Sequence, residues 1–343
     1  MVPQKSNKRV LITDYAWKSL DRERRILEEV GATLVPAKTG EEDELSILAA
    51  NVEGILTCWR RVSEKVIQNA PRCLAIGRYG IGLDNIDVPF ATQAGIIVTN
   101  VPSYCVEEVA EHTMALLLSL ARKITFYDRE VKSGVYNLQS QTPLYRISGK
   151  TLGIVGFGRI AKAVCRKAAG FGLRILVCDP PLRKADIAGH QVETVPFQEL
   201  LQSSDFISVH VPLKPDTRHL FDLGAFRQMK STAFIVNTSR GEVIDADALL
   251  IALDEGLIGG AGLDVLAKEP PVLRDRLVLH PRTIVTPHAA FNSEESLEEL
   301  QDTAAKQMAD VLSGRSPRFV VNPEVLKQAN LRAVLDGGKS LDS

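Results

Sequence analysis

The fold is decided by the stretch Thr151-Leu-Gly-Ile-Val-Gly156-Phe-Gly158-Arg-Ile-Ala161, where a short apolar run passes through a glycine-rich turn into an amphipathic helix. Gly156 permits a tight turn, Gly158 lets the backbone approach a pyrophosphate, and the small Ala161 keeps the helix close to the strand. A helix that begins near Arg159 would direct free N–H groups at the phosphates. Glycine turns of this kind also serve purely structural roles, but the strand–turn–helix context favours a dinucleotide site.

An acidic residue follows the glycines at the spacing that such a site requires. The next apolar run, 174–178, ends at Asp179, about 20 residues beyond the glycines, where a carboxylate accepts hydrogen bonds from an adenosine ribose. A carboxylate repels a 2′-phosphate, so the pattern favours NAD(H) over NADP(H). Arg183 and Lys184 are close enough in sequence to weaken that preference.

Short apolar runs alternate with helical segments along most of the chain, which indicates an α/β fold with parallel sheets. The first series of expected strands covers 9–13, 33–35, 54–57, 74–77 and 95–99, and the second covers 151–155, 174–178, 206–210, 233–237, 260–264 and 283–286. One long helix is predicted over 106–132 and another over 293–312, because apolar residues recur at helical spacing. The second series is long enough for a complete doubly wound sheet.

Length and composition restrict the class of protein. The 343 residues are 45% hydrophobic and 24% charged, which suits two domains with separate cores. The formal net charge of -1 gives no electrostatic case for a nucleic-acid partner. The run Asp21-Arg22-Glu23-Arg24-Arg25 mixes charges and is interpreted as a solvated helix face.

The first residues are polar, so no secretory signal is expected. The chain has no apolar stretch long enough to cross a membrane, so no membrane span is expected. A soluble, cytoplasmic protein is therefore expected. The five cysteines are scattered without a close pair, so reduced core thiols are expected and no metal site is predicted.

Three side chains with the chemistry of ketone reduction follow strands of the second series. Arg240 could bind a carboxylate and polarise a carbonyl, and His288 could donate a proton near neutral pH. Glu269 could hold the imidazole in place. Open α/β sheets bind ligands beyond the carboxyl ends of their strands, where these residues fall. Each also has a structural alternative, namely a surface-paired arginine, an ordinary loop histidine and a structural glutamate.

These segments together resemble the D-isomer-specific 2-hydroxyacid dehydrogenase family. The resemblance runs from about Val10 to Pro323 and is carried by the glycine motif and by Arg78-Tyr-Gly-Ile-Gly-Leu-Asp-Asn-Ile-Asp87, Asn100-Val-Pro102, Asn237-Thr-Ser-Arg-Gly-Glu-Val-Ile-Asp245, Gly262-Leu-Asp-Val265 with Glu269-Pro270, and Thr286-Pro-His-Ala-Ala290. It implies two doubly wound Rossmann-like domains, with an NAD-binding domain (102–295) inserted into a flavodoxin-like substrate-binding domain (1–101 and 296–330). Residues 331–343 are expected to form a disordered tail.

The resemblance also implies a reaction and a role for each matching residue. The reaction interconverts a D-2-hydroxy acid and its 2-keto acid with NAD. Arg240 would bind the substrate, His288 would be the general acid/base, and Glu269 would orient His288. Further substrate contacts are implied for Arg78, Tyr79, Gly80, Ile81 and Gly82. Cofactor contacts are implied for Thr113, Arg159 and Ile160 on the pyrophosphate, Asp264 on the nicotinamide amide, and also Gly156, Gly158, Asp179, Val211, Pro212, Thr217, Thr238 and Ala290. The family's usual homodimer through the NAD-binding domain is implied as well.

Within the family, the chain is similar to the C-terminal-binding protein corepressors and to bacterial phosphoglycerate dehydrogenase-like members. It has Phe291 where the corepressors carry tryptophan, and it has no counterpart of their long extensions. An NADH-sensing, corepressor-like interaction protein is the alternative to an enzyme. Phosphite dehydrogenases carry a lysine where Ile81 stands here, which argues against phosphite as a substrate.

Overall fold

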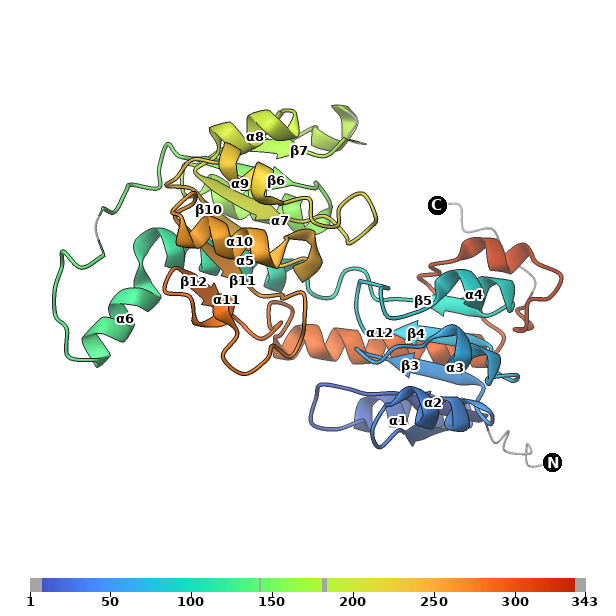
Figure 1. The fold of residues 1–343 in the computed structure, drawn as a ribbon. Coiled ribbons are helices and arrows are strands. Elements are labelled where there is room, and N and C mark those ends of the chain that lie inside the picture. Colours follow the sequence, from blue (N-terminus) through green and yellow to red (C-terminus); the bar gives the residue numbers. More distant parts are fainter. Residues whose placement is uncertain (1–7, 142, 181–183, 337–343) are drawn as a thin grey trace, which may run out of the picture. The chain divides into compact units, whose positions relative to one another are not determined.

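The computed structural model describes residues 8–141, 143–180 and 184–336. The chain divides into two compact units, the first formed by Met1–Tyr104 with Ser293–Ser343 and the second by Cys105–Asn292. The sequence placed the corresponding boundaries at 101/102 and 295/296. Each unit contains one parallel sheet with helices around it (Figure 1).

The first unit has a five-stranded sheet in the order β2-β1-β3-β4-β5 with every neighbouring pair parallel, which is the flavodoxin-like order. The central strand β3 is buried along its length, and its Ile55 pairs with Leu11 of β1 and Ile76 of β4. The strands are β1 (Lys8–Ile12), β2 (Ala32–Pro36), β3 (Gly54–Thr57), β4 (Ala75–Arg78) and β5 (Ile97–Thr99). The helices are α1 (Asp21–Glu28), α2 (Glu42–Ala49), α3 (Glu64–Gln68), α4 (Val88–Gln93) and α12 (Glu294–Leu312), with a 3-10 turn η3 (Pro323–Lys327).

The second unit has a seven-stranded parallel sheet in the order β12-β11-β10-β9-β6-β7-β8. The strands are β6 (Thr151–Val155), β7 (Arg174–Cys178), β8 (Glu193–Thr194), β9 (Phe206–Val209), β10 (Phe234–Asn237), β11 (Gly260–Leu263) and β12 (Thr283–Val285). All six predicted strands are present, and β8 was missed because its two exposed residues carry no apolar pattern.

Helices cover both faces of this sheet and enclose two cores (Figure 1). One core contains residues of α5 and α7, and the other contains residues of α8, α9 and α10. The helices are α5 (Val106–Arg122), α6 (Ile124–Lys132), α7 (Arg159–Ala169), α8 (Phe197–Ser203), α9 (Leu223–Gln228), α10 (Ala246–Asp254) and α11 (Arg276–Leu279), with 3-10 turns η1 (Lys184–Ile187) and η2 (Gly241–Val243). The expected doubly wound α/β architecture is thereby confirmed.

The predicted helix over 106–132 is interrupted at Lys123, so the prediction of one continuous helix was wrong. Lys123 adopts the left-handed conformation, with a φ of 56°, and ends α5 before α6 begins. Its ammonium lies 4.9 Å from the ring centres of both Phe126 and Phe234, and burial lowers its pKa. Because Phe234 lies on a distant strand, this contact could not be read from the local helical pattern.

Two further expectations differ from the structure. Glu23 was placed on a solvated face, but its side chain is fully buried. Residues 331–336 were assigned to a disordered tail, yet Arg332 donates its N–H to Gly95 and Ala333 is buried. Residues 337–343 lie outside the described ranges. The five cysteines are free thiols, four of them buried, and no helix of the described chain has the length and apolar character needed to cross a membrane.

Candidate active site

The glycine turn after β6 is held in a conformation that requires glycine at its first position. Gly156 has a φ of 86°, and a Cβ there would lie 2.8 Å from the carbonyl oxygen of His210. The next residue, Phe157, donates its N–H to Asp179 Oδ2 over 2.8 Å. At Gly158, by contrast, a Cβ would meet no atom within 4 Å, so the backbone faces open space there. The turn therefore has room for a diphosphate, and Asp179 has a second carboxylate oxygen for a ribose.

The first turn of α7 provides further groups that can bind the diphosphate of a dinucleotide. Arg159 and Ile160 form its first turn, where backbone N–H groups lack intrahelical acceptors and the helix dipole favours an anion. Ala161 is fully buried and lets the helix pack closely. These features fit NAD, which a Rossmann turn holds by its diphosphate. Arg183 lies outside the described residues, so its effect on cofactor preference stays a prediction.

The residues expected beside the adenosine follow β9, the neighbour of β6. Val211 is partly exposed and Pro212 is exposed, and the Thr217 hydroxyl donates to the Pro212 carbonyl over 2.6 Å. Thr217 thus stabilises the turn that carries them. His210 contacts the Ser208 hydroxyl over 2.8 Å, and burial lowers the pKa of His210 to about 4. A neutral structural histidine is the consequence.

Asp264 follows β11 and organises the backbone on which His288 sits. Its buried carboxylate accepts hydrogen bonds from the Thr286 hydroxyl (2.6 Å) and the N–H groups of Ala289 (2.9 Å) and Ala290 (3.0 Å). Its own carbonyl accepts the N–H of His288 over 2.8 Å. These bonds hold His288 at a φ of 52°, a left-handed conformation that is uncommon for a residue with a side chain.

Two residues of α5 also contact this region. His112 Nε2 lies 2.9 Å from the Thr286 hydroxyl, which already donates to Asp264, so the Nε2 nitrogen must be the donor. Sequence reasoning had given His112 no role. Thr113 is fully buried, donates to the Val109 carbonyl and contacts the Thr238 hydroxyl over 2.9 Å. The pyrophosphate contact expected of Thr113 stays a prediction.

His288 and Glu269 form a directly bonded pair. His288 Nδ1 lies 2.7 Å from Glu269 Oε2, and Glu269 Oε1 accepts the N–H of Leu266 over 2.8 Å. Burial alone would raise the pKa of Glu269, but the bonds from His288 and Leu266 and the charge of Arg240 together lower it below its ordinary value. Phe291 lies edge-on to the imidazole, with ring centres 6.3 Å apart. The Nε2 nitrogen of His288 is left for a reacting atom.

Arg240 is placed by a rigid turn after β10. The buried Asn237 side chain donates to the Arg240 carbonyl (2.9 Å) and accepts from the N–H (3.0 Å) and hydroxyl (2.8 Å) of Ser239. A Cβ on Gly241 would lie 2.0 Å from the Leu266 carbonyl carbon, so the turn packs directly on the segment that leads to Glu269. Sequence reasoning missed Asn237 as an anchor, although a buried amide at a strand end is a recognisable signal.

Arg240, Glu269 and His288 thus follow three adjacent strands, since β10, β11 and β12 are neighbours in the sheet. The structure gathers a guanidinium, a carboxylate and an imidazole at one edge. Such a set can bind an anionic substrate and transfer one proton.

The predicted substrate loop of the first unit follows β4. Tyr79 is buried, and the Arg78 guanidinium donates to the Tyr79 carbonyl and folds over Gly80, whose φ is 147°. Among the described residues, the N–H groups of Ile81 and Gly82 have no hydrogen-bond acceptor. Both residues are partly exposed. Two adjacent free N–H groups at a strand end can bind a carboxylate.

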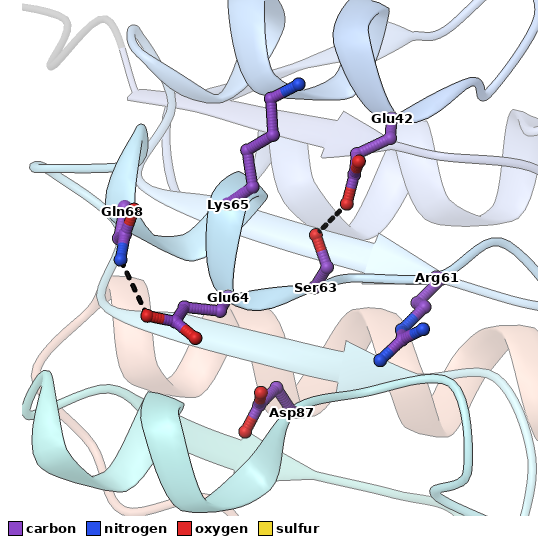
Figure 2. A pocket seen from close by; sticks show the side chains of 7 residues that line it. All are labelled: Glu42, Arg61, Ser63, Glu64, Lys65, Gln68 and Asp87. Atoms are coloured by element: carbon purple, nitrogen blue, oxygen red, sulfur yellow. Dashed lines mark hydrogen bonds between the residues drawn. The ribbon is translucent and has the colours of Figure 1, made fainter.

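A separate depression of about 380 Å³ lies among α2, α3 and the start of α4 in the first unit (Figure 2). It is lined by Glu42, Arg61, Ser63, Glu64, Lys65, Gln68 and Asp87. Most of these groups already have partners, because Ser63 bonds to Glu42, Gln68 to Glu64 and Lys65 to Asp43. We interpret this depression as a solvated surface.

Comparison with known proteins identifies relatives over most of the chain. Residues 114–290 match the family described as D-isomer specific 2-hydroxyacid dehydrogenase, NAD binding domain. A glyoxylate reductase of Korarchaeum cryptofilum is 42% identical over 78% of this chain and 81% of its own length. A D-3-phosphoglycerate dehydrogenase of Methanocaldococcus jannaschii is 38% identical over 90% of this chain and 58% of its own. The solved D-lactate dehydrogenase of Aquifex aeolicus, complexed with NAD and lactic acid, superposes with a TM-score of 0.82 at 26% identity and covers 93% of this chain and 98% of its own.

The doubly wound sheet with its glycine turn and Asp179 defines a dinucleotide-dependent oxidoreductase, and its cofactor is NAD. Within that class, the chain belongs to the D-isomer-specific 2-hydroxyacid dehydrogenase family, and it is an NAD-dependent D-2-hydroxyacid dehydrogenase. The resemblance noted in the sequence is confirmed.

Proposed function

We propose that this dehydrogenase reduces a small 2-keto acid to the D-2-hydroxy acid, with His288 as the general acid and Arg240 as the substrate anchor. The observation that carries the proposal is the 2.7 Å bond between His288 Nδ1 and Glu269 Oε2. It fixes the imidazole with Nε2 free, and the carboxylate offsets the positive charge of the protonated ring. A histidine held in this way can act as a general acid.

In this mechanism the residues of the chain bind the substrate and move one proton. Bound NADH supplies the hydride, held by the glycine turn, the start of α7 and Asp179. Arg240 pairs with the substrate carboxylate and stabilises the charge that develops on the carbonyl oxygen. His288 Nε2 donates its proton to that oxygen, and the reverse transfer occurs in oxidation. Asp264 keeps an oxygen, Oδ2, with capacity for a further donor such as the nicotinamide amide.

We assign the free N–H groups of Ile81 and Gly82 to the substrate carboxylate, with Tyr79, Gly80 and Arg78 shaping the loop. Thr238 and Ala290 remain proposed cofactor contacts. The relatives named above act on glyoxylate, phosphoglycerate and lactate by their names, so small 2-keto acids are the substrates to test first. A cytoplasmic setting is part of the proposal and agrees with five free cysteines.

We further propose a homodimer formed through the second unit. Large apolar side chains on α6 and the segment after it are exposed, including Val131, Tyr136 and Leu138. An exposed apolar surface of this kind is a common sign of a protein interface. Light scattering after gel filtration tests it, and a monomer at micromolar concentration would contradict it.

The experiment for the reaction follows NADH absorbance with glyoxylate, pyruvate, hydroxypyruvate and larger 2-keto acids, each repeated with NADPH. We expect His288→Ala to lower kcat by roughly 10²- to 10⁴-fold. His219→Ala is the matched control, because His219 is also a left-handed loop histidine in the same unit, with a φ of 53°. Equal activity of the His288→Ala protein and the wild type would refute the role of His288.

The same assay weighs the alternative of a corepressor-like NADH sensor. Such a protein needs cofactor binding but has no need of the His288–Glu269 pair. Absence of turnover across the panel, together with a partner whose binding depends on NADH, would favour that alternative.

A further inference from the structure

A buried acid lies behind the proposed substrate loop. Glu23 is on α1, its side chain is 0% exposed, and its carboxyl faces the Tyr79 hydroxyl and the Trp17 indole N–H. Among the residues that the structure describes, no lysine or arginine pairs with it. Burial raises the pKa of Glu23 above its ordinary value. An unpaired buried carboxylate is costly, so the neutral carboxylic acid is the favoured form.

The neutral acid has the hydrogen-bonding groups that its neighbours need. One oxygen can accept from Trp17 Nε1, and the O–H can bond to the Tyr79 hydroxyl. Within the described part of the chain, none of these polar atoms has a hydrogen-bond partner of regular geometry, and the Glu23 carboxyl is the side-chain group that the Tyr79 hydroxyl and the Trp17 indole approach. Trp17 and Tyr79 also pack edge to face, with ring centres 4.7 Å apart. The three side chains therefore form one buried cluster, which we call the Glu23 cluster.

Tyr79 connects this cluster to the loop that follows. Its N–H donates to Thr57 of β3 over 2.8 Å, and its side chain is 1% exposed. Gly80 comes next, and its carbonyl accepts the N–H of Val101 over 3.0 Å. The free N–H groups of Ile81 and Gly82 follow directly. Their direction depends on the backbone at Tyr79, because glycine at positions 80 and 82 gives the loop little stiffness of its own.

We propose that Glu23, as a neutral carboxylic acid, is a positioning residue that fixes Tyr79 and thereby the Ile81 and Gly82 N–H groups that receive the substrate carboxylate. The proposal rests on the proposed function, since that function assigns these N–H groups to the substrate. Glu23 does not touch the reacting atoms. It acts through Tyr79 on substrate binding and leaves proton transfer at His288 unchanged.

Matched variants separate this role from simple packing. Glu23→Gln keeps the shape, neutrality, donor and acceptor of the carboxylic acid, so we expect its kinetics to stay within about twofold of the wild type. Glu23→Leu keeps a similar size without polar atoms. It should raise KM for the 2-keto acid about tenfold and leave kcat and the KM for NADH within about twofold, the pattern of lost substrate binding. Glu28→Leu, at an exposed position of the same helix, is the control and should change none of them.

Hydrogen exchange supplies a readout that does not depend on turnover. The N–H groups of Tyr79 and Val101, which donate to Thr57 and Gly80, should exchange about tenfold faster in Glu23→Leu than in the wild type, whereas Glu23→Gln should match the wild type. If the wild type reduces no 2-keto acid but this exchange pattern is found, the proposed function fails and the positioning role stands.

Two results would overturn the positioning role. One is a folded Glu23→Leu protein with wild-type KM and wild-type exchange, and the other is a Glu23→Gln protein as impaired as Glu23→Leu. If Glu23→Leu does not fold, Tyr79→Phe removes only the hydroxyl that faces Glu23. Faster exchange at the N–H groups of Tyr79 and Val101 in that variant supports the proposal, and unchanged exchange overturns it.

Discussion

Gly241 and Leu266 approach each other so closely that a Cβ on Gly241 would lie 2.0 Å from the Leu266 carbonyl carbon. The contact joins the turn that carries Arg240 to the segment that ends at Glu269. Gly241→Ala should therefore push the two apart. We expect a loss of roughly 1–3 kcal/mol in the free energy of unfolding from overpacking, and a fall in kcat of up to about 10²-fold from misplaced groups.

Thermal denaturation and steady-state kinetics measure the two effects of Gly241→Ala. Gly170→Ala is a suitable control, because a Cβ at Gly170 would only meet Lys167 O at 3.5 Å. A Gly241→Ala protein with wild-type stability and kcat would show that the turn tolerates displacement, contrary to our reading of this contact.

The bond between Glu269 and His288 leads to a pH-dependent prediction. The pKa of Glu269 is lowered in the folded protein from its ordinary value of 4.5, because its bonds to His288 and Leu266 and the charge of Arg240 outweigh burial. A lowered pKa contributes stability that is fully present above the unfolded value and is lost as pH falls through the folded value. The wild type should thus be more stable than Glu269→Gln at pH 7, and the difference should shrink below about pH 4.5.

Melting temperatures of both proteins between pH 7 and pH 3 measure that difference. Glu269→Gln should also lower kcat at neutral pH by roughly tenfold or more, because the ring loses its charge partner. A gap in melting temperature that stayed constant down to pH 3 would contradict the assigned titration.

Two substitutions at Asp179 distinguish its effect on the preference for NADH over NADPH from its effect on the geometry of the glycine turn. Asp179→Asn keeps an oxygen that can accept the Phe157 N–H but removes the charge that repels a 2′-phosphate. We expect the ratio of kcat/KM for NADH over NADPH to fall by roughly tenfold. Asp179→Ala also loses the bond to Phe157 and should weaken binding of both cofactors. Identical ratios in Asp179→Asn and the wild type would show that other residues determine the preference.

The sequence allowed much of the fold and of the reacting groups to be predicted, because these depend on local patterns. Parallel strands buried on both faces read as continuous apolar runs, and Arg240, Glu269 and His288 stand just beyond such runs. The features that the sequence did not predict depend on contacts between residues that are far apart in the chain. From the sequence, Glu23 was assigned to a charged, solvated helix face, but in the structure its carboxyl faces Tyr79 and Trp17. The contact of Lys123 with Phe234 likewise joins residues far apart in the chain.

The pyrophosphate contact that the resemblance implies for Thr113 can be tested directly. The Thr113 side chain is buried, with its hydroxyl bonded to the Val109 carbonyl and 2.9 Å from the Thr238 hydroxyl. Thr113→Val removes these bonds and keeps the shape. A buried hydrogen bond contributes about 1 kcal/mol, which corresponds to roughly 2–4 °C in melting temperature for a unit of this size.

We therefore expect Thr113→Val to lower the melting temperature by about that amount and to leave the Kd for NADH within about twofold of the wild type. Calorimetric titration with NADH and thermal denaturation measure both quantities on the same sample. The opposite result, an unchanged melting temperature with NADH binding weakened tenfold or more, would mean that the hydroxyl turns toward the phosphates when the cofactor binds.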